Sequence, residues 1–312
     1  MTAGQVLRAA AKRWIRPALI PLARGIVRYA PSLTVRRVAW TRVAAPFFQY
    51  ADHDFVARTI FGARISGNSR DLIQRHIYYF GAWETNLTRF VNTALQNGDV
   101  FVDVGANIGY FTLQASKLVG KSGKVISFEA SPRIFAKLRD NLSRNRVTNV
   151  TAHNLAVSDT DGLVKIYLAS SSNIGETTII ATDSADFECE VAARPLSALL
   201  SPSELARVRV IKIDVEGAES QVVAGLLPML RGARLDLEIA IEISPKRLRV
   251  LNKKADDIVA SLSDHGFFPY RIENSYLELS YLSTEHPRPE RIRGSITAQT
   301  DVIFSRRNVD SL

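Results

Sequence analysis

The pattern of hydrophobic positions changes character near residue 98. Before that point apolar residues recur three or four positions apart, as in "ETNLTRFVNTAL" from Glu84, which is the spacing of one helix face. Beyond it, short uninterrupted apolar runs such as "VFVDV" (100–104) alternate with longer amphipathic segments. Alternating strands and helices predict a mostly parallel sheet with helices on both faces, and fully apolar strands suit the middle of such a sheet.

Further apolar segments continue this alternation to the end of the chain. The expected strands after the first are 124–130, 150–159, 207–217, 234–243, 267–272 and 300–306, and the expected helices are 109–120, 132–145, 217–230 and 246–266. Segments 162–169 and 187–196 are expected to form a hairpin or two added strands. No obvious helix joins the last two strands, which predicts that the final strand runs antiparallel.

The part of the chain before residue 98 is expected to be helical. Residues 1–50 are interrupted by four prolines, and residues 51–97 are expected to be mostly helical with a turn at 66–70. The net charge of +9 resides in the first 50 residues, which hold nine basic residues and no acid, while the remainder carries equal numbers of each sign. A neutral core with a basic arm argues against a nucleic-acid partner for the main domain.

The basic arm has two interpretations. Its arginines alternate with apolar residues, as in a broken amphipathic helix that lies on an anionic membrane surface. Alternatively, it is a helical extension that packs on the domain and keeps its arginines in solvent. The uncharged stretch 17–23 is too short and too rich in proline for a signal peptide core or a membrane span. A single cysteine, Cys189, excludes an internal disulfide and fits a reducing compartment. The expected location is the cytoplasm, and under the first interpretation residues 1–50 also contact the inner face of the membrane.

Polar residues gather directly after the predicted strands, where an open parallel sheet binds its ligands. The first strand ends at Asp103 and is followed by the small residues Gly105, Ala106, Asn107 and Gly109. Glycines at this turn let a ligand approach the backbone, and N–H groups at the following helix start favour an anionic group. Asp103 could bind a cationic group directly or through water. These features fit a ligand that has both a carboxylate and an ammonium group.

The second strand ends at Glu129, 20 residues beyond Gly109. A carboxylate at this position suits the two hydroxyls of a ribose. An amino-acid head joined to a ribose is the outline of S-adenosylmethionine. The spacing of the turn is GxxxG, whereas dinucleotide-binding proteins have GxGxxG, so the methyl donor is favoured over NAD.

Four motifs, "DVGANIGYFT", "FEASP", "NLAVSD" and "IKIDVEGAE", together resemble the FkbM family of S-adenosylmethionine-dependent methyltransferases over about residues 80–245. The resemblance implies a class I methyltransferase fold over residues 81–312, preceded by a helical extension over 1–80. It also implies O-methylation of a hydroxyl on a sugar, glycolipid or natural product. The donor-binding residues that the motifs and the resemblance imply are Glu84, Asp103, Gly105, Ala106, Asn107, Gly109, Glu129, Ser131, Asn154, Ala156 and Asp214. Ser197 and Ser244 depart from the family pattern at positions where relatives often carry other polar or acidic groups.

Three acids at the same sheet edge, Asp214, Glu216 and Glu242, are candidates for the base that deprotonates the acceptor hydroxyl. In the alternative, Asp214 and Glu216 bind a hard divalent cation that lowers the pKa of that hydroxyl. The base is favoured and no metal is expected, because no dense pattern of ligands appears.

Other functions remain open at this point. An NAD-dependent oxidoreductase needs a nicotinamide site and usually a second domain, and no candidate for either is visible. A non-catalytic protein could bind the donor while the arm holds it at a membrane. RNA as the acceptor is disfavoured by the neutral core.

Overall fold

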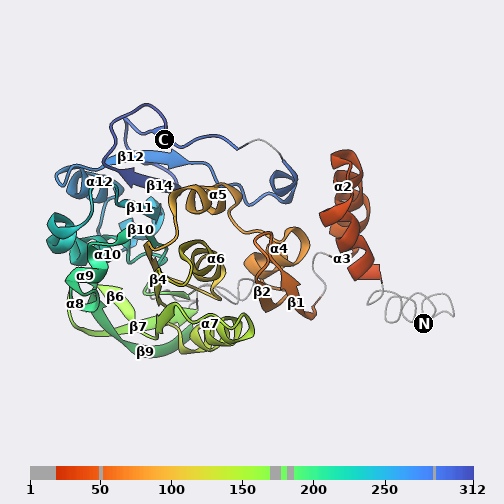
Figure 1. Ribbon diagram of the computed structural model, residues 1–312, viewed down its shortest axis with the longest axis horizontal. Coiled ribbons are helices and arrows are strands. Elements are labelled where there is room, and N and C mark those ends of the chain that lie inside the picture. The colour runs from red at the N-terminus through yellow and green to blue at the C-terminus, as the bar shows by residue number, and fades with distance from the viewer. Residues whose placement is uncertain (1–18, 49–51, 169–176, 181–185, 284–285) are drawn as a thin grey trace. The chain divides into compact units, whose positions relative to one another are not determined.

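The computed structural model describes most of the chain, and the part before residue 19 lies outside it. The described residues are 19–48, 52–168, 177–180, 186–283 and 286–312. The chain divides into two compact units (Figure 1). The smaller unit comprises residues up to Trp83 together with Tyr276–Glu285, and the larger unit comprises Glu84–Ser275 and His286–Leu312.

The smaller unit is built on helices and aromatic side chains. Its helices are the segment 19–29, α2 (Leu33–Ala39), the π-helix η1 (Trp40–Ala44), α3 (Ala45–Phe48), α4 (Leu72–Phe80) and the 3-10 helix η3 (Glu278–Leu282). Trp40 lies against the rings of Tyr79 and Phe80, and Phe80 also contacts Tyr281. These rings bury a large apolar area in a small unit and fix η1 and η3 on α4.

The expectation of a mostly helical segment from 51 to 97 is wrong between residues 54 and 68. There the chain forms an antiparallel hairpin of β1 (Asp54–Arg58) and β2 (Arg64–Asn68). In β1 buried and exposed residues alternate, and Phe55 and Ala57 point inward. A period of two identifies a half-buried strand, and this signal is present in the five residues of β1.

The larger unit contains an eight-stranded sheet. From one edge to the other its strands are β13 (Glu290–Arg291), β12 (Phe268–Ile272), β14 (Thr300–Ser305), β11 (Glu238–Ile243), β10 (Val208–Ile213), β3 (Val100–Val104), β4 (Lys124–Phe128) and β5 (Val150–His153). The strands from β11 to β5 are all parallel, and β14 runs antiparallel to both β11 and β12. This arrangement confirms the doubly wound class I methyltransferase fold with an antiparallel last strand.

Helices cover the two faces of this sheet. They are α5 (Thr85–Ala94), α6 (Tyr110–Val119), α7 (Pro132–Arg144), α8 (Leu196–Leu199), α9 (Pro202–Leu205), α10 (Glu219–Leu226), η2 (Leu227–Gly232), α11 (Pro245–Val250) and α12 (Ala255–Ser263). α5 contacts α6, which packs on β3 and β4, whereas α10 contacts α8 and α12. Successive side chains of β3 point to opposite faces of the sheet. Val102 belongs to the core cluster around α10, and Asp103 bonds to Thr112 of α6.

Two expected elements differ in detail, and one is confirmed. The third strand divides into β5 and β6 (Ala156–Ser158), and β6 joins a separate small sheet with β7 (Gly162–Leu168), β8 (Thr177–Thr178) and β9 (Asp186–Pro195). The expected hairpin is confirmed, because β7 pairs antiparallel with β9. The expected helix 246–266 is two helices, α11 and α12, and Asn252 between them has a positive φ of 56°.

Candidate active site

The turn between β3 and α6 is set by the protein's own backbone. Gly105 has a φ of 79°, and a Cβ on it would lie 1.8 Å from the carbonyl oxygen of Asp214. Gly109 has a φ of 91°, and a Cβ there would lie 2.6 Å from Cδ1 of Leu138 in α7. The approach of the Asp214 backbone and the positive φ require glycine at position 105, and the positive φ favours glycine at position 109. Their presence therefore does not by itself indicate a ligand.

The N–H groups from Gly105 to Gly109 are bonded within the protein, whereas the expected anion site at the start of α6 stays a prediction. The N–H groups of Gly105 and Ala106 donate to the carbonyl of Phe128, and that of Gly109 donates to the carbonyl of Ala106. The N–H of Asn107 donates to Oε2 of Glu129 at 2.8 Å, and that of Ile108 donates to Oδ1 of Asn107. The five backbone N–H groups of residues 105–109 are therefore already bonded and are not available to a ligand.

Asp103 is fully buried beneath this turn. Its Oδ2 accepts a hydrogen bond from Oγ1 of Thr112 at 2.6 Å, while its Oδ1 has no hydrogen-bond partner among the described residues. Burial raises the pKa of Asp103, and the nearby Lys212 opposes this effect. A buried oxygen without a partner could accept from a water or from a cationic ligand group.

Glu129 lies at the end of β4 with its carboxylate buried. It accepts from the N–H groups of Asn107 and Ser131, and burial raises its pKa to about 7 in spite of these two bonds. Nδ2 of Asn154 donates to the carbonyls of Glu129 and Ala130 at 2.9 Å. The structure therefore brings Asn154 beside Glu129.

Two other residues of the predicted donor site have structural contacts, one as a helix cap and one in a strand pair. The hydroxyl of Ser131 caps α7 by accepting from the N–H of Ile134, and it donates to Oε1 of Glu188 at 2.6 Å. Ala156 begins β6, where it pairs with Ala193 of β9.

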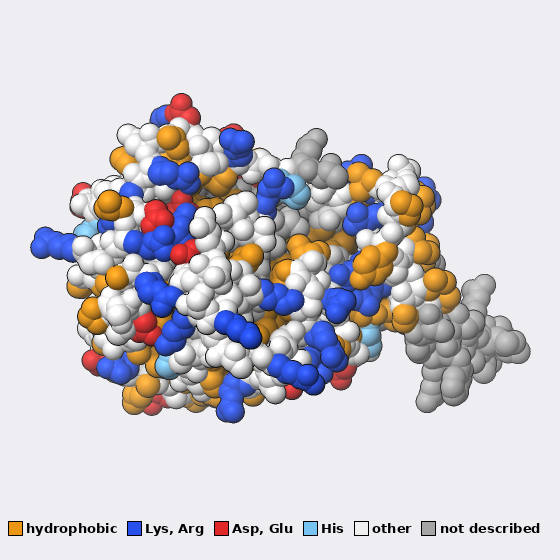
Figure 2. All heavy atoms as spheres, viewed as in Figure 1, with side chains coloured by type: hydrophobic (Ala, Val, Ile, Leu, Met, Phe, Trp, Pro, Cys, Tyr) orange, Lys and Arg blue, Asp and Glu red, His pale blue; other side chains and the backbone are white. Residues whose placement is uncertain are grey.

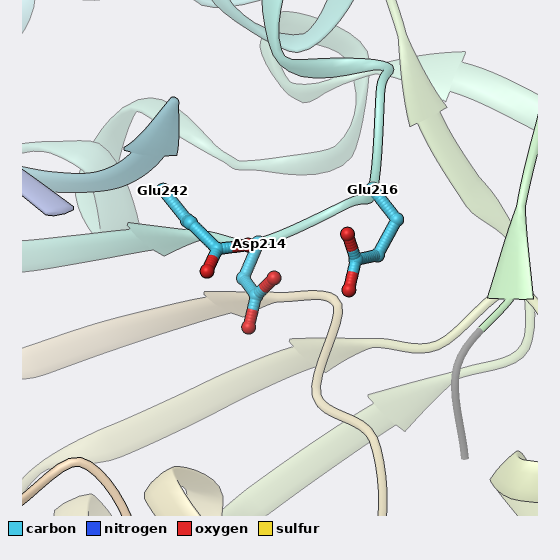
Figure 3. Close-up of side chains that lie close together, drawn as sticks. All are labelled: Asp214, Glu216 and Glu242. Atoms are coloured by element: carbon cyan, nitrogen blue, oxygen red, sulfur yellow. The ribbon is translucent and has the colours of Figure 1, made fainter. Parts of the chain in front are cut away.

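The three predicted acids come together at the carboxyl edge of the sheet. Asp214 and Glu216 follow β10, and Glu242 lies near the end of β11 (Figure 3). Each offers a carboxylate oxygen, and these three oxygens lie within 4.8 Å of one another. The cluster is therefore positioned to accept a proton, and it could also hold a metal ion.

Two of these acids are paired with cations. Nζ of Lys212 lies 3.0 Å from Oδ2 of Asp214, and a guanidinium nitrogen of Arg247 lies 2.5 Å from Oε2 of Glu216. Glu242 accepts a hydrogen bond from the neutral amide of Gln299 at 2.6 Å. Lys212 is buried, which lowers its pKa, but attraction to Asp214, Asp103 and Glu84 outweighs burial and the pKa is raised.

A small cavity next to the cluster is lined by further acids. Glu84, Lys212, Asp214, Glu242 and Asp301 are among the residues that line it. Burial, followed by repulsion from Asp301 and Asp214, raises the pKa of Glu84 well above its usual range. Burial raises the pKa of Asp301 to about 6. Four carboxyl groups around one ammonium group mark this cavity as the most acidic part of the site.

Lys212 and Asp301 were not among the predicted site residues. Lys212 could have been found, because it is a charged residue inside the apolar strand "VRVIKI" and lies two positions before Asp214. Asp301 opposes Glu242 across the antiparallel pair β11 and β14. That register depends on residues 59 positions apart in the chain, so no local signal indicates it.

The sequence model of the methyltransferase FkbM domain matches residues 103–269, which is more than half of the chain. The chain belongs to the FkbM methyltransferase family. This confirms the resemblance carried by the four motifs, and with it S-adenosylmethionine as the methyl donor of the family. The match includes the turn, Glu129 and the acid cluster.

Two curated relatives are similar to this FkbM-family chain. "Methyltransferase 1" of Beauveria bassiana is 29% identical over 144 residues, which are 40% of this chain and 57% of that protein. The 31-O-demethyl-FK506 methyltransferase FkbM of Streptomyces tacrolimicus is 28% identical over 205 residues, which are 55% of this chain and 74% of that protein. The match to the Beauveria protein thus spans less than two thirds of its length.

Solved structures are more distant from this FkbM-family chain. An O-methyltransferase from Thermotoga maritima has 14% identity and a TM-score of 0.40, with 82% of this chain and 79% of that chain covered. A precorrin-6y C5,15-methyltransferase from Geobacter metallireducens has 15% identity and a TM-score of 0.39, with 71% and 88% covered. The fold assignment therefore rests on the strand order of the larger unit and not on these solved structures.

Proposed function

We propose that this chain is an O-methyltransferase that transfers the methyl group of S-adenosylmethionine to a hydroxyl of a sugar, a glycolipid or a natural product. The cluster of Asp214, Glu216 and Glu242 carries the proposal. An acceptor hydroxyl must lose its proton as its oxygen attacks, and a carboxylate within reach can take that proton. The name of the Streptomyces relative, a 31-O-demethyl-FK506 methyltransferase, also points to oxygen as the acceptor atom.

The donor would lie along the glycine turn and the end of β4. S-adenosylmethionine supplies a methyl group that is activated by its sulfonium. A carboxylate has about four lone-pair sites, so Glu129 could accept from ribose hydroxyls while it keeps its bonds to the N–H groups of Asn107 and Ser131. Oδ1 of Asp103, which lacks a hydrogen-bond partner among the described residues, suits the ammonium end through a water. The residues proposed to contact the donor are those of the sequence analysis: Glu84, Asp103, Gly105, Ala106, Asn107, Gly109, Glu129, Ser131, Asn154, Ala156 and Asp214.

In the proposed step the acceptor O–H bond breaks as the new O–CH3 bond forms. The bond from that methyl carbon to the sulfonium sulfur breaks and leaves neutral S-adenosylhomocysteine, and the proton passes to a carboxylate of the cluster. Protonation of Asp214 or Glu216 would cost its ion pair with Lys212 or Arg247. Glu242, whose carboxylate accepts a hydrogen bond from Gln299 and lies in the same cluster, is the candidate base that we test first. Asp214 and Glu216 would orient the hydroxyl.

A metal-assisted version is the second candidate, since three carboxylates within 4.8 Å could hold a divalent cation. The two ion pairs argue against it, because Lys212 and Arg247 already compensate much of the negative charge that would attract the ion. We therefore keep the carboxylate base as the main proposal.

The first experiment tests donor binding. Calorimetry and thermal unfolding with S-adenosylhomocysteine should show binding and stabilisation, whereas NAD at the same concentration should show neither. Binding of NAD alone would favour an oxidoreductase. Binding of neither compound would end the proposal.

The second experiment identifies the acceptor and the base. Mass spectrometry of glycans and lipids from cells with and without the gene should reveal a species that differs by one methyl group. On that acceptor Glu242→Gln should lower turnover by about 10²–10⁴-fold. Glu190→Gln, which changes an exposed acid on β9, should not. Unchanged turnover in Glu242→Gln and Glu216→Gln would exclude both as the base. The absence of any methylated glycan or lipid would exclude those two acceptor classes and leave a natural product as the acceptor, or a non-catalytic donor-binding protein.

The proposal also includes the setting of the enzyme. We place the catalytic domain at residues 81–312 after an extension over 1–80, and the protein in the cytoplasm. A glycolipid acceptor would be met at a membrane surface, so contact of residues 1–50 with the inner face of the membrane belongs to the same proposal.

A further inference from the structure

The helix formed by residues 19–29 has two apolar stripes. Ile20, Ala23 and Val27 are buried within the smaller unit. A second stripe of Leu19, Leu22, Ile26 and Tyr29 is exposed, with Leu22 at 61% and Tyr29 at 67% of full exposure. Residues three and four apart share one side of a helix, so these four side chains form one face. The fold thus uses one stripe and leaves the other in solvent.

Exposed apolar side chains are also present in α2 and η1. Val35, Val38 and Val43 are exposed there, and the neighbouring Arg37 and Arg42 are exposed as well. The opposite side is anchored, because Trp40 packs on Tyr79 and Phe80. The exposed apolar residues therefore do not contribute to the core of the unit.

The arginines of this region also fall into two groups, those that bond to the smaller unit and those that are exposed. Nε of Arg24 donates to the carbonyl of Tyr78, and its guanidinium lies 4.6 Å from the centre of the Tyr78 ring. Nε of Arg36 donates to the carbonyl of Val27 and so ties α2 to the preceding helix. Arg37 and Arg42, in contrast, are exposed, and each directly precedes an exposed valine in the chain. Figure 2 shows hydrophobic and basic side chains interspersed over these helices.

We propose that this surface, here called the arm face and made of Leu19, Leu22, Ile26, Tyr29, Val35, Arg37, Val38, Arg42 and Val43, docks on an anionic phospholipid bilayer. The charge of the first 50 residues is entirely positive, which complements anionic lipid headgroups. Apolar side chains among arginines suit the boundary between headgroups and acyl chains. No helix in the described part of the chain is long and apolar enough to cross a bilayer. This inference deepens the proposed membrane contact and does not depend on methyl transfer.

Flotation of the full chain with lipid vesicles tests the proposal. The chain should float with vesicles of phosphatidylcholine and phosphatidylglycerol, and much less with phosphatidylcholine alone. The double variant Leu22→Ser, Tyr29→Ser should bind at least about tenfold more weakly, because it removes apolar contacts with the acyl region. Arg37→Gln with Arg42→Gln should weaken binding by roughly tenfold or more, and high salt should have a similar effect.

A matched control removes exposed leucines elsewhere. Leu163 in β7 and Leu235 before β11 are 68% and 82% exposed, so Leu163→Ser with Leu235→Ser should float like the unchanged chain. Stabilisation by S-adenosylhomocysteine should persist in every variant, which separates the docking result from the donor site. Equal flotation of the unchanged chain and the Leu22/Tyr29 variant, or no flotation at all, would overturn the proposal. A dimer in solution that this variant abolishes would instead make the arm face an interface between two copies.

Discussion

The carboxylate of Glu129 accepts a hydrogen bond from the backbone N–H of Asn107 at 2.8 Å, which ties the end of β4 to the glycine turn after β3. The carboxylate that we assign to the ribose therefore also holds the turn. Because burial raises the pKa of Glu129 to about 7, this group changes charge within the physiological range.

Donor affinity should depend on pH through Glu129. Ribose hydroxyls donate to the carboxylate form, which is lost as the pH falls through about 7. We expect the affinity for S-adenosylhomocysteine to fall by about tenfold between pH 8 and pH 6. Calorimetry across this range measures it. Glu129→Gln should bind weakly at every pH, whereas Glu219→Gln, at another buried glutamate whose pKa burial raises to about 7, should keep the dependence. A flat profile in the unchanged chain would contradict the role of Glu129.

Gly105→Ala should destabilise the larger unit. The new Cβ would meet the carbonyl oxygen of Asp214 at 1.8 Å, and the φ of 79° disfavours any side chain. We expect a loss of about 2–5 kcal/mol in the free energy of unfolding, measured with urea. Gly266→Ala is the matched control, since its φ is 81° but no atom lies within 4 Å of the added Cβ. It should cost only about 1–2 kcal/mol. Equal losses at both positions would show that the close approach to Asp214 is unimportant.

Lys212→Met should cost about 3–5 kcal/mol of stability at pH 8, because it leaves the buried Asp103 and the partly exposed Asp214 without their shared cation. The loss should shrink as the pH falls, since burial raises the pKa of Asp103 and its protonation then removes the uncompensated charge. Unfolding in urea at several pH values tests both points. The partly exposed pair of Lys124 and Glu204 provides the comparison, and Lys124→Met should cost no more than about 1 kcal/mol. A loss that grows toward low pH would contradict this account.

Chelation should leave methyl transfer unchanged. Lys212 and Arg247 pair with two of the three clustered acids, so the cluster has less need of a divalent cation. Turnover with EDTA, and with magnesium or manganese restored afterwards, measures the effect. If activity disappears with EDTA and returns with the metal, the metal-assisted version is correct and the carboxylates are its ligands.

Much of the catalytic unit could be predicted from local sequence. Apolar runs located the strands, and the residues that follow them located the turn and the acid cluster, because parallel strands end at one edge of a sheet. The hairpin at 54–68 was not predicted, although the alternation of the buried Phe55 and Ala57 with exposed neighbours in β1 has the period of a strand. The four motifs were sufficient to indicate the family.

The amino-acid sequence by itself determined which residues end each strand, and hence which acids meet at the sheet edge. Only the tertiary structure decided how these groups are paired. The opposition of Glu242 and Asp301, the engagement of the N–H groups in the turn and the occupation of the space above Gly105 by the Asp214 carbonyl all join segments far apart in the chain. Strand and helix spacing is a local property of the backbone, whereas burial and strand register depend on contacts that form only when the sheet is complete.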